Sequence, residues 1–508
     1  MQELISADAG TSGIKVALVE ASGKILASSV QSYPSTVQGS RAEQDPRDWW
    51  SGFRKALEEL GRQRDLRKAG ALVLSGQMQD LIPLVPGKEP DWALLYSDTR
   101  AREEWEALAE DPGREYLERT TANLGDPSVL PAKIRWLRTR HPEKLSGDFR
   151  ILLGAHDYLA WRLTGRVVTD YTNASTTGLL AFRENRWDRR ILEAAGISPE
   201  NLPELEPAAR VTGGLTTEAA AELGLPSGLP VIHGAGDAGA ATVGDGAGTA
   251  GTVSCYLGTS GWVSATGTAP VSPSLGIYNL RHPDPEQVIH IGAMSLTGGN
   301  TDWALRNLIR RSEPETGEAA PAAAEWEEFS RLAGSAAPGS GGVFYLPYLM
   351  GERSPFRDPD ARGAFIGLRK DSRREEMCRA VLEGVAYALG SILEVMDSGR
   401  EKGRHLRLSG GGAANPQWRR ILSGVTGGTV GSSPAARETG VLGNVIIAAN
   451  ALGWHQGWEL PGSFLAGERR ESASPEEQEI YRRGRKIFSL MYPALKDVFH
   501  QIGQWNAE

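Results

Sequence analysis

A group of side chains near the start of the sequence could bind a phosphate together with a metal ion. Asp8 ends an apolar run, and Gly10-Thr11-Ser12-Gly13 follows it. The glycines allow backbone N–H groups to approach an anion, and Thr11 and Ser12 add hydroxyl donors. Asp8 would repel phosphate itself, but it can hold Mg²⁺, which then bridges to the phosphate oxygens. A plain hairpin with an aspartate at its start is the competing interpretation.

The same turn returns as Gly258-Thr259-Ser260-Gly261, without a preceding acid. Both copies lie between runs typical of β-strands, which predicts two related domains with a boundary in the run Gly244 to Gly246. We therefore expect domains over residues 1–245 and 246–508. A phosphate chain held from two sides needs one turn on each domain and a metal carboxylate on only one. Chance recurrence in a glycine-rich chain is the alternative.

A third glycine motif surrounds Asp237. Residues Gly234 to Gly239 match the G-x-G-x-x-G pattern of dinucleotide-binding turns. However, Asp237 would repel a pyrophosphate, and no clear βαβ unit with an acidic strand end follows at the expected distance. We instead expect the glycines to bring Asp237 to the floor of a cleft, where it accepts a proton from a substrate hydroxyl as a general base. A buried capping aspartate is the alternative.

A fourth motif, Ser409 to Asn415, places three glycines between an expected strand and a helix that starts at about Pro416. Small residues there let a flat ring lie along the backbone, and Asn415 can hydrogen-bond to that ring. A plain strand-to-helix turn is the alternative interpretation of this motif.

Strands and helices are expected to alternate along the chain, as in α/β domains. A three-stranded meander opens the sequence, and Asp45 can cap a helix that has Pro46 at its first position. The segment 312–341 is expected to be a surface insertion, helical around Trp326. Other expected strands are 69–76 and a pair that begins within 251–266. The segment 229–246 is expected to be a strand, a glycine turn and a small-residue helix or loop, and 405–427 a strand, a glycine turn and a helix. Other expected helices are 131–141, 155–165, 375–396 and one from Pro475 that breaks near Pro493.

Composition excludes several classes of protein. The 508 residues are 40% hydrophobic and 23% charged, which is ordinary for a globular chain of two or three domains. A formal net charge of −8 disfavours nucleic-acid partners. Two cysteines cannot form a disulfide framework, and we see neither a signal peptide nor an apolar run long enough to cross a bilayer. We expect a cytoplasmic protein, with no membrane partner. Its eight histidines are scattered and are expected to be structural.

Taken together, these motifs resemble the FGGY family of carbohydrate kinases, and most closely its xylulokinase-like branch. The resemblance runs in order over essentially the whole chain. Its segments are DAGTSGIK (8–15), EQDPRDWW (43–50), SGQMQD (75–80), YSDTR (96–100), GAGDAGAATVG (234–244), LGTSG (257–261), GGVFYLPYLMGERSP (341–355), the run 363–383 and SGGGAANPQW (409–418).

The resemblance implies an actin-like or hexokinase-like ATPase fold of the ribonuclease H-like type, with two α/β domains and an active-site cleft between them. It implies ATP-dependent phosphorylation, with Mg²⁺, of a hydroxyl of a small sugar, most closely a ketopentose such as xylulose. Kinases of ribulose, an L-sugar, erythritol or glycerol are the alternatives within this class. A chaperone-like ATPase and a sugar-binding regulator are the alternatives outside it, although no peptide-binding or DNA-binding module is visible. A homodimer is compatible with this interpretation.

The resemblance also assigns roles to positions. Asp237 matches the catalytic base, and Asp8 and Asp237 match the metal-associated acids. The matched sugar-side residues are Met78, Gln79, Tyr96, Asp98 and Asp237. The matched ATP contacts are Thr11, Ser12, Lys15, Gly258, Thr259, Gly298, Thr301, Asp302, Gly411, Gly412 and Asn415.

The departures from the family pattern lie mainly on the sugar side. Met78-Gln79-Asp80 stands where xylulokinases typically have Met-His-Gly, Ala238 replaces a common Asn or Gln, and Tyr96 replaces a common Trp. The first family signature, around Lys133, is only partly kept. Sites that hydrogen-bond a hydroxyl discriminate strongly through such groups. The resemblance therefore specifies the reaction more closely than the sugar.

Overall fold

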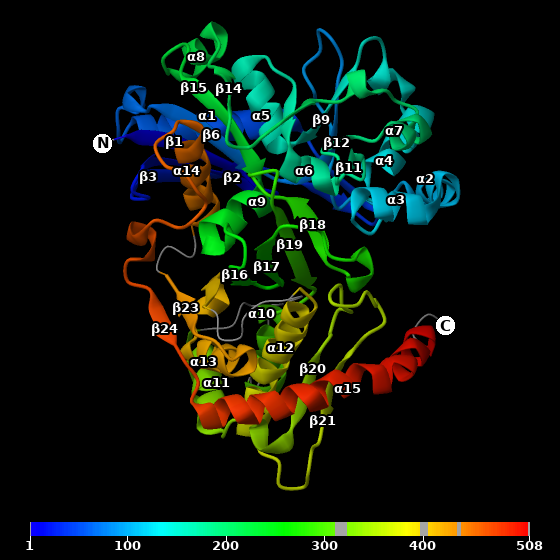
Figure 1. Ribbon diagram of the computed structural model, residues 1–508, viewed down its shortest axis with the longest axis vertical. Helices are drawn as coiled ribbons and strands as arrows, with labels where there is room; N and C mark the ends of the chain where they lie inside the picture. The colour runs from blue at the N-terminus through cyan, green and yellow to red at the C-terminus, as the bar shows by residue number, and fades with distance from the viewer. Residues whose placement is uncertain (1, 310–322, 397–404, 434–437, 506–508) are drawn as a thin grey trace, which may run out of the picture.

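The computed structural model describes residues 2–309, 323–396, 405–433 and 438–505. Two mixed β-sheets form the centres of its two halves, and helices pack around them (Figure 1). The predicted insertion at 312–341 lies partly outside the described residues. Its described part contains a helix that includes Trp326.

The first sheet has six strands. Strands β1, β2 and β3 form the predicted antiparallel meander, while β1, β6 and β15 run parallel to one another. The order across the sheet is β14 (Val211–Gly214), β15 (Pro230–Gly236), β6 (Ala71–Gly76), β1 (Glu3–Ala9), β2 (Gly13–Glu20) and β3 (Ile25–Ser32).

The second sheet has seven strands and repeats this arrangement. An antiparallel hairpin of β16 and β17 corresponds to β1 and β2, and β22 and β23 continue it in parallel. The order is β18 (Tyr278–Arg281), β19 (Val288–Met294), β17 (Gly261–Gly267), β16 (Val253–Leu257), β22 (Leu406–Ser409), β23 (Val430–Ser432) and β24 (Arg469–Glu471). The two Gly-Thr-Ser-Gly turns join the equivalent hairpin strands of the two sheets, so the sequence repeat reflects a repeated structural unit.

A third sheet of five strands extends the first half of the molecule. Its order is β4 (Thr36–Gln38), β5 (Arg41–Gln44), β8 (Ala93–Leu94), β7 (Met78–Leu84) and β9 (Arg150–Gly154). Three strand pairs complete the strands: β10 (Val168–Asp170) with β13 (Glu204–Glu206), β11 (Leu180–Ala181) with β12 (Arg186–Trp187), and β20 (Phe344–Pro347) with β21 (Gly363–Ile366).

Some of the helices begin at a side chain that caps them, and α1 is an example. Asp45 accepts a hydrogen bond of 3.0 Å from the backbone N–H of Arg47, and Pro46 begins the helix, as predicted. The α-helices are α1 (Pro46–Gly61), α2 (Arg102–Leu108), α3 (Arg114–Thr121), α4 (Leu130–Arg140), α5 (Ala155–Thr164), α6 (Tyr171–Thr176), α7 (Arg189–Ala195), α8 (Thr217–Leu223), α9 (Asp237–Thr242), α10 (Gly298–Ala304), α11 (Ala323–Ser335), α12 (Arg374–Met396), α13 (Pro416–Thr426), α14 (Thr439–Ala451) and α15 (Pro475–Trp505).

The predicted break at Pro493 is wrong, because α15 continues through this residue. Proline removes one backbone donor from a helix and leaves the carbonyl four residues earlier without a partner. Both Pro493 and Ser489 are exposed, so water can bond the carbonyl of Ser489.

The first sheet is covered on both faces. Alternate residues of β1 pack with α1 and α5 on one face, whereas Leu4 packs with α14 on the other. Helix α14 belongs to the C-terminal half of the sequence, yet it lies against β1, β6 and β15 (Figure 1). No helix within the described ranges is both long and apolar enough to span a membrane.

Candidate active site

Asp8 and Asp237 lie at the same edge of the first sheet. Asp8 is next to the last residue of β1 and pairs in register with Ser75 on β6. Gly236 ends β15 opposite Gly76, so Asp237 follows directly at the carboxyl end of a parallel strand. Both aspartates are partly exposed, although the strands that carry them are largely buried. The sheet topology therefore positions two accessible carboxylates near one another.

Burial raises the pKa of both carboxylates, and the charge of Asp8 adds to the shift of Asp237. Burial and the charge of Asp8 raise the pKa of Asp237 to about 7, even though its Oδ1 accepts a hydrogen bond of 2.7 Å from the N–H of Ala238. Burial also raises the pKa of Asp8, against a hydrogen bond of 2.8 Å from the Ser75 hydroxyl. A cation beside these groups would favour both ionised forms, so the pair fits a divalent metal with oxygen ligands.

The first Gly-Thr-Ser-Gly turn is held through its backbone carbonyls. The N–H of Gly10 bonds the carbonyl of Gly13 at 3.0 Å, and the Gln44 side chain donates to the carbonyl of Thr11 at 2.6 Å. Thr11 is partly exposed and Ser12 is exposed. These contacts fix the turn while its hydroxyl groups remain near the surface.

Lys15 takes part in a contact between distant parts of the chain. Its ammonium group forms an ion pair with Glu438, immediately before α14. A contact between Lys15 and ATP would have to share or replace this pair, so the predicted ATP contact of Lys15 remains a prediction.

The second Gly-Thr-Ser-Gly turn lies against the start of α10. The N–H of Gly298 donates to the carbonyl of Gly258 at 2.8 Å, and Thr259 is exposed beside them. Thr301 is buried with its hydroxyl unpaired, whereas Asp302 is partly exposed and burial raises its pKa. The structure thus brings together predicted nucleotide residues from two separate segments.

The glycines expected to contact adenosine lie next to this turn. Strands β16 and β22 are parallel, with Tyr256 opposite Ser409, so Gly258 and Gly411 follow their strands at the same sheet edge. Gly411 is exposed and Gly412 is partly exposed.

Asn415 is the N-cap of α13. Its side-chain oxygen accepts hydrogen bonds from the backbone N–H groups of Gln417 and Trp418, at 2.9 and 3.4 Å. The oxygen therefore already has a structural role, and a contact to a purine ring would use the amide nitrogen.

The predicted sugar-side residues differ in how accessible they are. Met78 is buried against Leu280 and Ile289 of the second sheet. Gln79 is partly exposed with φ of +62°, and its side chain donates to the carbonyl of Ser128 at 3.2 Å. Tyr96 is 43% exposed, which leaves its ring free for a ligand.

Asp98 is fully buried and already paired. It accepts a hydrogen bond of 2.8 Å from the N–H of Ala42 and two-point contacts from the guanidinium of Arg100. Arg100 also pairs with Glu43 at 2.6 Å. These contacts suit a structural role, and the sugar contact of Asp98 remains a prediction.

Several residues at the site were not identified from the sequence. Asp80 is buried, accepts a hydrogen bond of 3.1 Å from the N–H of Tyr96, and has one carboxylate oxygen without a partner. Burial raises its pKa well above the usual range, although the charge of Lys133 opposes this. Asp80 was noted only as a departure from the family pattern. Ser75 on β6 accepts a hydrogen bond from Asn444 on α14. The two residues are 369 positions apart, so no local sequence pattern predicts this contact.

Comparisons with known proteins give matches over both halves of the chain. The model of the FGGY family of carbohydrate kinases matches residues 4–244 for its N-terminal domain and 253–452 for its C-terminal domain. The xylulose kinase of Escherichia coli is 32% identical over 94% of this chain and 98% of its own.

Solved structures show the same architecture. Gluconate kinase from Lactobacillus acidophilus matches with a TM-score of 0.88 at 25% identity, over 99% of both chains. Xylulose kinase from Rhodospirillum rubrum matches with a TM-score of 0.87 at 28% identity, over 98% of this chain and 100% of its own. The predicted two-domain α/β fold of a carbohydrate kinase is therefore confirmed.

Proposed function

We propose, from the premise that the chain belongs to the FGGY family of carbohydrate kinases, that it transfers the γ-phosphoryl group of ATP to a hydroxyl of a ketopentose such as xylulose. The observation that carries this proposal is the pair of partly exposed carboxylates, Asp8 and Asp237, at the carboxyl ends of β1 and β15, which flank β6 at one edge of the first sheet.

Asp237 would act as the general base. A pKa near 7 suits this role, because the carboxylate is both available at neutral pH and basic enough to accept a proton. In the reaction, the sugar oxygen forms a bond to the γ-phosphorus as the bond to the β-phosphate oxygen breaks. The hydroxyl proton passes to Asp237, and ADP leaves with the electron pair of the broken bond.

Asp8 would hold Mg²⁺, with Asp237 close to it. Carboxylate oxygens are the ligands that Mg²⁺ prefers, and the ion, when bound, neutralises charge on the phosphate oxygens. The bond from Ser75 keeps one oxygen of Asp8 oriented. Its other oxygen approaches Gly440, where the β-carbon of any larger residue would lie 2.6 Å from it.

The two Gly-Thr-Ser-Gly turns would hold the phosphate chain from opposite domains. Thr11 and Ser12 would donate from the first, and Gly258 and Thr259 from the second. Gly298, Thr301 and Asp302 would complete the nucleotide side, with Gly411, Gly412 and Asn415 at adenosine. The boundary between the two proposed domains would lie at residue 245. Helix α14, from the C-terminal domain, packs on the first sheet.

The sugar side favours a neutral substrate over gluconate. Gluconate is the substrate in the name of the similar kinase from Lactobacillus acidophilus. Met78, Gln79 and Tyr96 carry no positive charge, and the guanidinium of Arg100 is bound to Asp98 and Glu43. A substrate carboxylate would therefore lack a free cationic partner among these residues.

A coupled ADP-release assay tests the proposal. Xylulose, ribulose, gluconate, erythritol and glycerol are each supplied with Mg-ATP, and we expect the highest kcat/KM with a ketopentose. Closure around the sugar predicts only weak ATP hydrolysis without it. Hydrolysis indifferent to every sugar would instead favour a non-kinase ATPase.

The Asp237→Asn variant should lose roughly 10²–10⁴-fold in kcat, the usual contribution of a positioned base. Asp371→Asn, at an exposed position, is the matched control. Near-full sugar kinase activity in the Asp237→Asn variant would show that Asp237 is not the general base.

A further inference from the structure

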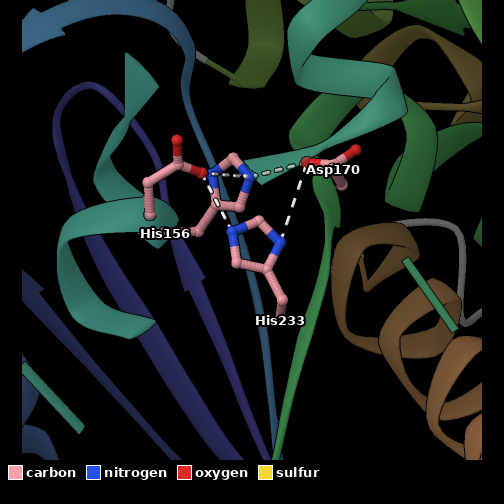
Figure 2. Close-up of side chains that lie close together, drawn as sticks. His156, Asp170 and His233 are labelled. Carbon is pink, nitrogen blue, oxygen red and sulfur yellow. Dashed lines mark hydrogen bonds and ion pairs between the residues drawn. The ribbon is translucent and has the colours of Figure 1, made fainter. Parts of the chain in front are cut away.

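Four buried side chains of the metal-ligating types meet next to the strand that leads to Asp237. His156 lies at the start of α5, Asp170 ends β10, and His233 lies on β15 (Figure 2). Asp157 follows His156 on α5. None of the four is more than 1% exposed. The histidines are scattered in the sequence, but the fold brings these two rings to a centroid distance of 4.7 Å.

The ligand atoms of this cluster point toward one another. His156 Nε2 lies 2.9 Å from Asp170 Oδ2 and 3.4 Å from Asp157 Oδ1, and His233 Nε2 lies 2.9 Å from Asp157 Oδ1. One such atom from each residue lies within 4.8 Å of the other three. A tetrahedral zinc site with bonds of about 2.1 Å places its ligand atoms roughly 3.4 Å apart. Small side-chain adjustments would therefore surround one ion.

In Asp157, Asp170 and His233 a second polar atom contacts a backbone group, whereas Nδ1 of His156 is buried without a partner. Asp157 Oδ2 accepts a hydrogen bond of 3.0 Å from the N–H of Leu153, and Asp170 Oδ1 accepts one of 2.8 Å from the N–H of Thr172. His233 Nδ1 lies 3.3 Å from the carbonyl oxygen of the next residue. Outer partners of this kind orient metal ligands and fix the histidine tautomer.

Charge also points to a cation. Two carboxylates buried this deeply need positive charge beside them. A divalent ion supplies that charge, and a protonated imidazole within a hydrogen-bonded network is the other source. Two imidazoles favour a transition metal over Mg²⁺ or Ca²⁺, and Zn²⁺ accepts four nitrogen and oxygen ligands in tetrahedral geometry.

We propose that His156, Asp157, Asp170 and His233 bind one divalent transition-metal ion, with Zn²⁺ as the expected occupant. Four protein ligands leave no open coordination position, so this ion would be structural rather than catalytic. The ion would link α5 and β10 to His233 on β15. His233 lies four residues before Asp237. The metal content of the protein is independent of which sugar, if any, the protein phosphorylates.

Elemental analysis of the full chain, purified without a histidine tag and without added metal, is the first test. We expect roughly one zinc ion per chain. After chelator treatment, ZnCl₂ should raise the melting temperature by more than about 3 °C. Co²⁺ added to the metal-depleted protein should give the visible absorption of tetrahedral cobalt.

Two variants and one control locate the ion. Asp170→Asn keeps a side chain that can cap α6 but removes the anionic ligand, and His233→Gln removes one imidazole. Both should lose the bound zinc and the thermal shift. His500→Gln disrupts the second group that could hold a metal among the described residues, formed with Asp358 and Asp360, and should keep the zinc.

The proposal is overturned if the wild-type protein contains no metal and binds neither Zn²⁺ nor Co²⁺ with one-to-one stoichiometry. The cluster would then be a metal-free network of hydrogen-bonded ion pairs. Zinc lost in His500→Gln but retained in Asp170→Asn would also overturn it. If both cluster variants fail to fold, the cobalt spectrum of the wild-type protein decides, since tetrahedral nitrogen and oxygen ligation supports the site and an octahedral spectrum contradicts it.

Discussion

The hydroxyl of Ser75 donates a hydrogen bond of 2.8 Å to Oδ1 of Asp8. The same hydroxyl lies 3.0 Å from the side-chain nitrogen of Asn444, which donates to it from α14. A helix from the C-terminal half of the chain thus supports, through one serine, the acid expected to hold Mg²⁺.

Replacing Ser75 with alanine should weaken the use of Mg²⁺. The bond from Ser75 lowers the pKa of Asp8 and orients its carboxylate, so its loss makes the ionised, metal-binding form less favourable. A hydrogen bond to a charged group contributes about 1.5–3 kcal/mol, which predicts an increase of roughly 10-fold or more in the Mg²⁺ concentration for half-maximal kinase rate. Ser254→Ala, at a buried serine paired with Ser264 in the second sheet, is the control. An unchanged Mg²⁺ dependence in Ser75→Ala would contradict this role.

The pH dependence of the reaction should follow the ionisation of Asp237. Burial, followed by the charge of Asp8, raises its pKa to about 7, so the base is protonated and inactive at lower pH. We expect kcat/KM for the sugar to rise with pH as Asp237 ionises, with an apparent pKa of about 7 that bound Mg²⁺ moves downward, and to fall about tenfold per unit well below that pKa. Rates measured between pH 5.5 and 8.5 check this, with activity reassayed at pH 8 to exclude unfolding. A flat profile across this range would argue against Asp237 as the base.

Local motifs predicted the parts of the fold that short stretches of chain determine. The turn at Gly258 lies between two strands, and Asp45 with Pro46 starts α1, because turn and cap geometry depend on neighbouring residues. At Pro493 the local rule failed, since the exposed position makes the lost hydrogen bond inexpensive.

Long-range contacts could not be predicted in this way. The ion pair of Lys15 with Glu438 joins residues 423 positions apart, so neither local spacing nor composition predicts it. Asp98 matched a sugar-side position, but the hydrogen bond that it accepts from the N–H of Ala42 joins residues 56 positions apart. The carboxylates Asp8 and Asp237 were identified separately, and only the parallel order of β1, β6 and β15 places them at one edge.

Asp245 should make stability depend on pH. It is buried, and burial raises its pKa to about 7 although a hydrogen bond of 3.0 Å from Ser409 opposes this. Its pKa is higher in the folded state than the value of about 3.9 expected when unfolded. The resulting stability is fully present below about pH 4 and is lost as the pH rises through about 7. The total is on the order of 4 kcal/mol.

The Asp245→Asn variant, which mimics the neutral acid, should therefore have a higher melting temperature than the wild type at pH 8. The difference should shrink toward pH 5. Melting curves across this range measure it, with the exposed Asp497→Asn as a control for general charge effects. A difference that stays constant with pH would show that ionisation of Asp245 does not contribute.

Helices α14 and α9 approach each other so closely at Gly443 that there is no room for a side chain there. A β-carbon added there would lie 1.9 Å from the carbonyl oxygen of Ala240, a backbone atom that cannot rotate away. Gly443→Ala should therefore destabilise the protein by about 2 kcal/mol or more. Because α9 begins at Asp237, the displacement should also lower kcat.

Gly61→Ala provides the matched comparison, since a β-carbon at this last residue of α1 meets no atom within 4 Å. Alanine is favoured over glycine in a helix by about 0.5–1 kcal/mol, so this variant should be neutral or slightly more stable. Chemical unfolding and kinase rates of both variants measure the contrast. If Gly443→Ala unfolds and reacts like Gly61→Ala, then α14 does not fix the position of α9 through this contact, and the close approach of the two helices is not required for the site.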